Sequence, residues 1–263
     1  MPIDRRQLLS GRAGLLGLAW LAPARRALAL GADAEVGVAL LAHGGGAEAR
    51  PQAVEQLMWE ASKRTSIDVR ERPVLVGLDD ADLFRHPLLV WIGLGDVPPL
   101  GEAARTRLGR YLRSGGSLFI DDASPEGDEA FDAAVRREMK AIWPDRPLAR
   151  LSNDHTLYRS FFLLERPFGR IDREPHLWGM DFDDRSPVVY GRNDLFGAFG
   201  RDSLGNWLLP VYPGGAAQRE MAFRLGINVL MYATCLNYKR DQVHTTAILR
   251  RRRWKVDQAR ETR

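Results

Sequence analysis

Two short segments with apolar side chains at consecutive positions constrain the fold of this 263-residue chain more than any other feature. They are Leu88–Ile92 and Ser117–Ile120, and only Ser117 in them is polar. Because successive side chains of a strand point to opposite faces of the sheet, such strands must be covered on both faces. Amphipathic helical patterns alternate with these segments. The alternation predicts an α/β fold with a mostly parallel sheet between two layers of helices.

The other elements follow from hydrophobic spacing and turn residues. Further strands are expected within Glu35–Ala42, Ile67–Val76, Gly179–Asp184 and Val188–Tyr190, and a short apolar segment covers Thr156–Leu164. Helices are expected over Pro51–Thr65, Gly101–Ser114, Asp128–Trp143 and Gln218–Asn237. The chain contains no internal repeat and no low-complexity linker. We therefore expect one domain over residues 30–238, between a separate N-terminal segment and a C-terminal arm.

The N-terminal segment has the features of an export signal. Asp4–Leu9 contains the pair Arg5-Arg6 and resembles the twin-arginine motif, and an apolar stretch follows at Ala13–Ala24. Ala27–Ala29 is a small-x-small cleavage site. Residues 1–29 are therefore predicted to be a twin-arginine signal peptide, which directs a folded protein to the periplasm. An uncleaved anchor or an amphipathic helix is the alternative.

Charge is distributed unevenly along the chain. The whole chain carries a net charge of +4, but residues 1–29 carry +4 and residues 238–263 carry +6, so the segment between them carries −6. An acidic body argues against a nucleic-acid-binding surface on the domain. The only cysteine is Cys235, which excludes an intrachain disulfide and is expected to be a buried structural residue of the last helix.

Several blocks of residues together resemble a bacterial family known as domain-of-unknown-function family 4159. They are Thr65–Val69, Asp82–Phe84, Tyr111–Gly116, Asp121-Asp122 with Phe131-Asp132, Arg136–Met139, Asn153–Leu157 and Leu225–Asn228. The resemblance implies a Rossmann/flavodoxin-like three-layer sandwich related to class I glutamine amidotransferases. It also implies genes near those of MoxR-type ATPases and von Willebrand A-domain proteins in envelope operons. It implies no activity.

The nucleophile that an amidotransferase requires is missing. Such an enzyme presents its thiol on a Gly-x-Cys-x-Gly turn, and the sequence contains neither that turn nor Gly-x-Ser-x-Gly. Cys235 lies within a helical pattern and does not replace it. Glutamine hydrolysis by a thiol is therefore not expected.

Polar residues that follow the predicted strands are the candidate ligand-binding or catalytic groups, because ligand sites in open α/β sheets gather at the carboxyl ends of strands. Asp121 and Asp122 end one strand, and a carboxylate there could bind a cation or act as an acid or base. Asn193 and Asp194 follow another strand. In the alternative interpretation, these side chains cap helices or fix turns.

Two histidines complete the set of candidates. His155 could act as a base beside Asp122 or as a metal ligand, or it could simply pack beside an N-cap formed by Asn153 or Asp154. His43, Gly44 and Gly45 could face an anionic ligand, although the Gly-Lys-Ser/Thr ending of a Walker loop is absent. The histidines and the cysteine show no zinc-ligand spacing, so no metal and no cofactor are predicted.

The C-terminal arm, residues 239–263, contains the run Arg250, Arg251, Arg252, Arg253 and Trp254. It is interpreted either as a solvated tail or as an ordered arm. An ordered arm could dock an acidic envelope protein or make peripheral contact with anionic lipid headgroups.

Taken together, these features favour a non-catalytic binding or assembly subunit of a bacterial envelope complex. One alternative is a hydrolase that acts on a carbohydrate or peptide with Asp122 and His155. Another is a ligand-sensing domain. Convergence of Asp122, His155 and Asn193 in one pocket would favour the hydrolase. The sequence names no substrate, partner or oligomeric state.

Overall fold

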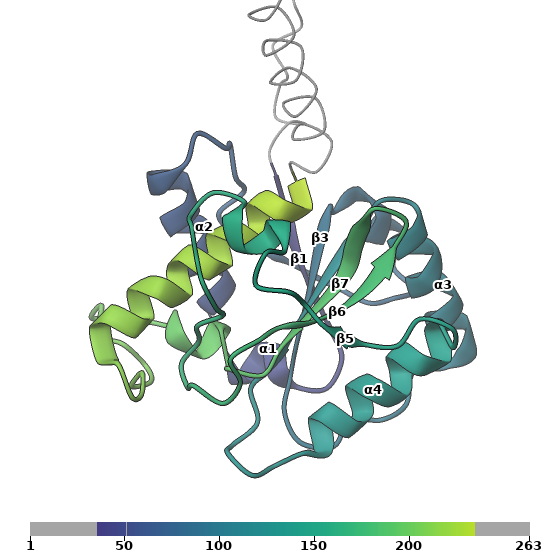
Figure 1. Ribbon diagram of the computed structural model, residues 1–263. Helices are drawn as coiled ribbons and strands as arrows, with labels where there is room; N and C mark the ends of the chain where they lie inside the picture. The colour runs from purple at the N-terminus through teal and green to yellow at the C-terminus, as the bar shows by residue number, and fades with distance from the viewer. Residues whose placement is uncertain (1–35, 51, 235–263) are drawn as a thin grey trace, which may run out of the picture. The chain divides into compact units, whose positions relative to one another are not determined.

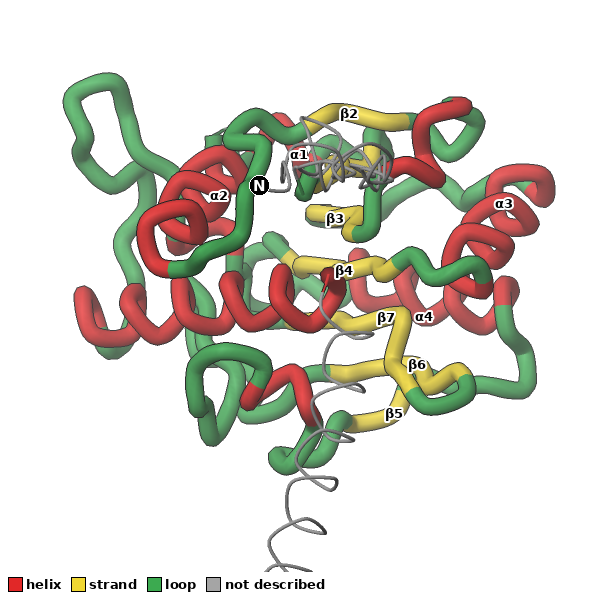
Figure 2. Tube along the Cα trace, turned by 90° about the horizontal axis from the view of Figure 1, so that it is seen from above, coloured by secondary structure: helices red, strands yellow, loops and turns green. Residues whose placement is uncertain are grey.

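The computed structural model describes residues 36–50 and 52–234. Within these residues, seven strands form one sheet in the order β2-β1-β3-β4-β7-β6-β5, which Figure 2 shows edge-on. The strands are β1 (Val38–Leu41), β2 (Val74–Val76), β3 (Leu88–Gly93), β4 (Ser117–Asp122), β5 (Ala149–Arg150), β6 (Trp178–Phe182) and β7 (Arg185–Gly191). The first five strands in the spatial order pair in parallel, and β6 and β5 join them antiparallel.

Helices cover both faces of this sheet. They are α1 (Gly46–Ala49), α2 (Ala53–Arg64), α3 (Glu102–Arg113), α4 (Ala130–Ile142) and a helix over residues 215–234. Figures 1 and 2 show α2 and the helix over 215–234 on one face, and α3 and α4 on the other. This arrangement confirms the predicted α/β fold, a Rossmann/flavodoxin-like sandwich with a mostly parallel sheet.

The central strands carry the apolar residues that predicted the fold. Every residue of β3 and β4 is buried. Trp91 of β3 packs on the α3/α4 side with Tyr111 and Phe131, whereas Phe119 of β4 packs on the other side with Phe199 and Leu230. Burying apolar area at about 25 cal/mol per Å² on both faces is the main stabilisation of such a sheet.

The close approach of α4 to the sheet requires glycine at the end of β3. A Cβ at Gly93 would lie 1.9 Å from a ring carbon of Phe131. The side chain of Phe131 therefore packs directly on the backbone of β3, and its ring lies edge-on to Trp91 at a centroid distance of 5.3 Å. This contact fixes the position of α4 relative to the carboxyl end of β3.

The structure differs from the sequence-based expectations in three places. The sequence predicted no helix between the first strand and Pro51, and Gly46 begins the short helix α1 there. The strand expected within Ile67–Val76 is confined to β2, with one isolated bridge between Val36 and Val69. The pair β6–β7 is an antiparallel hairpin, which the pattern after Pro147 did not reveal.

Several predicted features lie outside the described residues. They are the signal peptide over residues 1–29, Cys235, and the arm over residues 239–263 with Arg250, Arg251, Arg252, Arg253 and Trp254. Among the residues that the structure describes, no helix combines the length and apolar character needed to cross a membrane.

The strand order places a topological switch between β1 and β3. The chain passes from β1 to β2 on one side and then returns to β3 on the other side. The connection that leaves β1 leads to β2 on one side, whereas the connection that leaves β3 leads to β4 on the other side, so a crevice opens between them at the carboxyl ends of β1 and β3. Ligands of open α/β folds bind in crevices of this kind.

Candidate functional site

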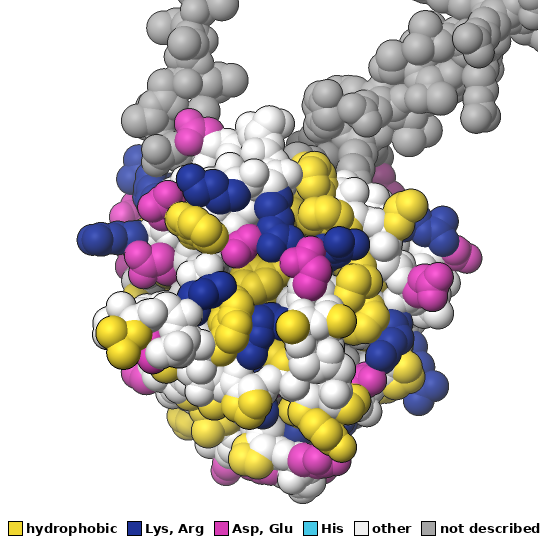
Figure 3. All heavy atoms as spheres, turned by 90° about the vertical axis from the view of Figure 1, so that its left-hand side faces the viewer, with side chains coloured by type: hydrophobic (Ala, Val, Ile, Leu, Met, Phe, Trp, Pro, Cys, Tyr) yellow, Lys and Arg dark blue, Asp and Glu magenta, His cyan; other side chains and the backbone are white. Residues whose placement is uncertain are grey.

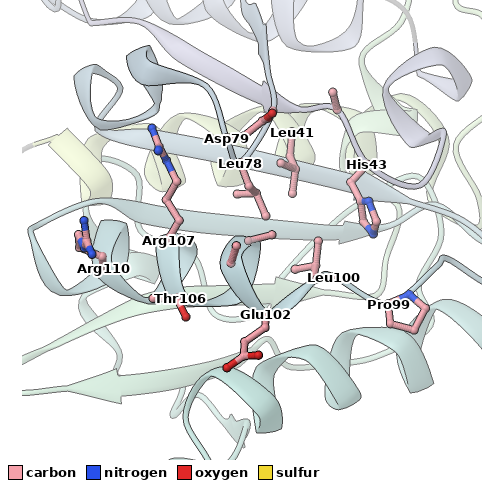
Figure 4. Close-up of a pocket in the computed structure, with 15 residues that line it drawn as sticks. Leu41, His43, Leu78, Asp79, Pro99, Leu100, Glu102, Thr106, Arg107 and Arg110 are labelled. Carbon is pink, nitrogen blue, oxygen red and sulfur yellow. The ribbon is translucent and has the colours of Figure 1, made fainter.

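A cavity of about 950 Å³ lies beside this switch point. Its walls come from the ends of β1 and β2, the loop after β3 and residues 102–110 of α3, and Figure 4 shows them. Leu41, Leu78 and Leu100 form the apolar middle of the cavity. Figure 4 shows His43 and Pro99 at one end and Arg107 with Arg110 at the other. The cavity thus has the apolar lining and the few polar groups that characterise small-molecule sites.

His43 is the predicted site residue that reaches this cavity. Its Nε2 atom donates to the carbonyl oxygen of Pro98 at 2.9 Å, and this bond leaves Nδ1 as an acceptor. Gly44 and Gly45 do not line the cavity. Their φ angles of 82° and 68° lie in the left-handed region, where glycine is unstrained, and a Cβ at Gly44 would lie 2.5 Å from Val97. Their role in the structure is the tight turn that positions His43.

The four polar residues predicted after β4 and β7 do come together, in a buried cluster of charged side chains. Asp121, Asp122 and Asp194 are fully buried, and Asn193 is 4 % exposed. None of them lines the 950 Å³ cavity. Each of them accepts hydrogen bonds from within the chain.

Asp121 caps the turn that follows β7. Its two carboxylate oxygens accept from the backbone N–H groups of Leu195 and Phe196, both at 2.8 Å. Burial, reinforced by the neighbouring carboxylate of Asp194, raises the pKa of Asp121 to about 8, against the opposing effect of these two backbone donors.

Asp122 fixes a turn and forms ion pairs. It accepts from the backbone N–H of Ser124 at 3.0 Å, and the guanidinium groups of Arg173 and Arg192 approach it at 3.0 and 3.4 Å. The side chain of Asn193 accepts from the backbone N–H groups of Arg173 and Glu174 at 3.0 and 2.8 Å. Asn193 therefore positions the segment that carries Arg173, one of the two ion-pair partners of Asp122.

Asp194 anchors two arginines from distant parts of the chain. Arg50 donates to both of its oxygens, at 2.9 and 2.7 Å, and Nε of Arg170 donates to one of them. The backbone N–H of Gly197 donates to Oδ1 at 3.1 Å. The whole carboxylate is therefore engaged, and the cluster ties α1 and the loop around residue 170 to the end of β7.

His155 lies at the opposite end of the sheet from Asp122. Its Nδ1 accepts from the backbone N–H of Leu157 at 3.2 Å, so Nε2 carries the hydrogen and donates to Ser186 Oγ at 3.0 Å. Ser186 in turn donates to Asp181 at 2.5 Å. In the β4–β7 register, Ser186 is level with Gly116, six residues from Asp122, or roughly 20 Å along the strands. The structure therefore does not bring His155 and Asp122 together.

The donor and acceptor directions of the hydrogen bonds among His155, Ser186 and Asp181 indicate a structural role. In a serine hydrolase, the imidazole accepts the hydroxyl proton of the nucleophile. Here the imidazole donates to Ser186, and its basic nitrogen is occupied by a backbone donor. Burial lowers the pKa of His155, which favours this neutral state. The serine Oγ therefore has no base in this arrangement.

A third feature is an apolar surface around a hairpin over residues 200–208. Leu204, Trp207 and Leu208 of the hairpin are 85 %, 37 % and 45 % exposed. Trp59 of α2 is 43 % exposed, and it borders a hollow of about 510 Å³ that residues Arg201–Ser203 of the hairpin also line. We call these four exposed side chains the hairpin surface. Figure 3 shows the side of the molecule on which α2 and the helix over 215–234 lie, with hydrophobic side chains among basic and acidic ones.

Residues 37–234 match the family described as Domain of unknown function (DUF4159). The chain belongs to this family. The match covers the sheet and the helices on both of its faces, and it confirms the family resemblance deduced from the sequence. A search of curated proteins finds no match.

The family description names no activity, so the chemistry of the site rests on the geometry of this chain. Within the described residues, no three His, Cys, Asp or Glu side chains are placed to hold a metal ion. Sequence reasoning missed the arginines of the buried cluster, Arg50, Arg170, Arg173 and Arg192, as well as Ser186 and Asp181. No local motif marks these residues, since their partners lie far away in the sequence.

Proposed function

We propose that this chain is a non-catalytic binding subunit of a bacterial envelope assembly, exported in the folded state by the twin-arginine pathway. The observation that carries the proposal is the hairpin surface. Large exposed apolar side chains grouped on one surface are typical of protein–protein contact sites. Tryptophan and tyrosine are enriched at the energetic centres of such interfaces, and Tyr212, four residues after Leu208, is 73 % exposed.

The hairpin is held rigidly, which is the second support for a docking role. Asp202 Oδ1 accepts from the backbone N–H groups of Leu204 and Asn206 at 2.9 and 2.8 Å. Two guanidinium groups lie over the ring of Trp207, with Arg201 at 3.6 Å and Arg219 at 4.1 Å from its centroid. A surface that is ordered before binding loses little conformational entropy when a partner docks.

The polar groups of the domain support binding without turnover. The carboxylates at the ends of β4 and β7 are buried and engaged in caps and ion pairs. His155 is bonded at both ring nitrogens and lies at the other end of the sheet. A hydrolase that uses Asp122 and His155 together would need a different arrangement of the chain.

Export is proposed from the sequence. Arg5-Arg6, the apolar stretch and Ala27–Ala29 together match a twin-arginine signal. Replacing both arginines by lysine in the tagged full chain is expected to retain the protein in the cytoplasmic fraction. Periplasmic recovery of that variant would refute the export route.

The assembly role is tested by affinity capture of the full chain from solubilised envelopes of its bacterial host. A stoichiometric partner is expected with the wild-type protein and is expected to be lost with Leu204→Asp. The matched control is Leu75→Asp, which changes a leucine that is 56 % exposed on the edge strand β2. A third sample lacks residues 242–263 and measures the contribution of the basic arm. Equal capture by the Leu204→Asp and Leu75→Asp variants would refute docking through the hairpin surface.

A further inference from the structure

The cavity at the switch point is large enough to enclose a small molecule. Its volume of about 950 Å³ lies at the upper end of the range of ligand sites, roughly 300–1,000 Å³. The hairpin surface and this cavity share no lining residue, because the hairpin borders the separate 510 Å³ hollow. An inference about the cavity therefore stands independently of the proposed docking role.

The middle of the cavity offers apolar contact. Leu41, Leu78 and Leu100 are between 2 % and 6 % exposed and line its wall, and the exposed methyl groups of Ala42 and Ala103 border it. A ligand that covers these side chains removes apolar surface from water, which is favourable by about 25 cal/mol per Å². The body of the ligand is therefore apolar.

One end of the cavity carries positive charge. Arg107 and Arg110 lie three residues apart on α3, so their side chains share a face of the helix. Arg107 donates to the carbonyl oxygen of Asp80, a neutral group, at 2.5 Å. Within residues 36–50 and 52–234, the guanidinium of Arg110 has no hydrogen-bond or ion-pair partner. The charge of Arg110 is therefore available to a ligand.

The acidic residues of the wall only partly offset these two cations. Figure 4 shows the Glu102 carboxylate at the rim, turned away from Leu41 and Leu78, and Asp79 on the opposite side. The Arg110 end of the cavity thus keeps a positive charge. At the other end, His43 Nδ1 is an acceptor that a donor group of a ligand could reach.

We propose that this cavity binds an amphipathic anion, a molecule with an apolar body and one carboxylate or phosphate group. The anionic group pairs with Arg110 and Arg107. The body lies against Leu41, Leu78 and Leu100, and a donor at its far end bonds to His43.

Two dyes with the same aromatic body test the proposal on the full chain. One is 8-anilino-1-naphthalenesulfonate, which carries one anionic group, and the other is N-phenyl-1-naphthylamine, which is uncharged. Fluorescence titration is expected to show one saturable site for the anionic dye. Arg110→Glu is expected to weaken the anionic dye about tenfold, as expected for the loss of one charge-assisted contact, and the neutral dye less than twofold.

Two further variants locate the site. Ala103→Trp places a large side chain in the cavity from an exposed position, so it is expected to weaken both dyes at least tenfold while leaving the circular dichroism unchanged. Arg72→Glu is the matched control, because Arg72 is an exposed arginine outside the cavity wall. Anionic-dye affinity that is unchanged in both Arg110→Glu and Ala103→Trp would overturn the proposal.

Displacement of the bound dye distinguishes the two kinds of anion. Decanoate and decyl phosphate carry the same chain and differ in the headgroup. Displacement by decanoate in preference to decyl phosphate assigns a carboxylate ligand, and the reverse preference assigns a phosphate ester. Failure of both compounds to displace the dye would overturn the proposal that the cavity binds an amphipathic anion.

Discussion

Asp194 is the residue whose replacement most directly tests the account of the buried charge cluster. Its carboxylate is fully buried and receives Arg50 on both oxygens and Arg170 on one. Asp194→Asn keeps the shape of the side chain and an oxygen that can accept from Gly197 N–H. Asparagine also tolerates the φ of 49° at this position. The substitution therefore removes the charge with little change in backbone strain.

The expected cost follows from the burial of the partners. Removing one partner of a buried ion pair typically destabilises a protein by about 3–5 kcal/mol. The side chains of Arg50 and Arg170 are 14 % and 20 % exposed, so water can partly solvate them after the change. A destabilisation at the lower end of this range, about 3 kcal/mol, is therefore expected for the loss of the charge that pairs with Arg50 and Arg170.

One effect acts in the opposite direction. The Asp194 carboxylate helps to raise the pKa of Asp121. Without it, Asp121 ionises more easily and is attracted to Arg50, which offsets about 1 kcal/mol of the cost. The net loss is therefore about 2 kcal/mol, which for a domain of this size lowers Tm by roughly 4–8 °C.

The assay is urea unfolding of the full chain at pH 7.5, followed by tryptophan fluorescence and circular dichroism. The matched control is Asp172→Asn, which removes a carboxylate that pairs with Arg166 at the surface, where the two side chains are 30 % and 37 % exposed. A surface pair contributes about 0–1 kcal/mol. If Asp194→Asn costs no more than Asp172→Asn, the buried cluster does not stabilise the fold as argued.

Two other predictions concern Gly197, beside the buried charge cluster, and His155, at the other end of the sheet. Gly197→Ala is expected to lower the free energy of unfolding by about 2–3 kcal/mol, because its Cβ would lie 2.3 Å from the Asp194 carboxylate. A urea midpoint unchanged from wild type would contradict that contact. Burial lowers the pKa of His155, so the unfolded chain takes up a proton at about pH 6.5 while the folded state does not. Stability is therefore expected to fall as the pH decreases below about 6.5, by up to about 1.4 kcal/mol per pH unit for this group. His86 and His176, whose pKa values burial also lowers, add to the effect. Urea midpoints at pH 7.5 and 5.5 should differ less in His155→Gln than in wild type, and an equal difference would exclude His155 as a source.

The candidate site residues show which features of the site local sequence patterns could predict. Asp121, Asp122, Asn193 and Asp194 were placed correctly at the carboxyl ends of neighbouring strands, because parallel strands bring their ends to one edge. Their partners were not predictable. The contact between Arg50 and Asp194 joins residues 144 positions apart, and that between Arg173 and Asp122 joins residues 51 apart. Sequence spacing carries no information about contacts at such separations.

The sequence by itself determined the layers of this protein. The apolar runs at β3 and β4 and the apolar stripes of the helices indicate which surfaces must be buried. The sequence shows this because the spacing of apolar residues is a local property. Only the tertiary structure decided what the polar residues do. It placed His155 against Ser186 at the opposite end of the sheet from Asp122 and buried Asp122 and Asp194 among arginines. Among the described residues, it also left Arg110 without an ion-pair partner at a cavity. The physical reason is that a charge or hydrogen-bonding group acts through its neighbours in space, and the packing of distant segments selects those neighbours.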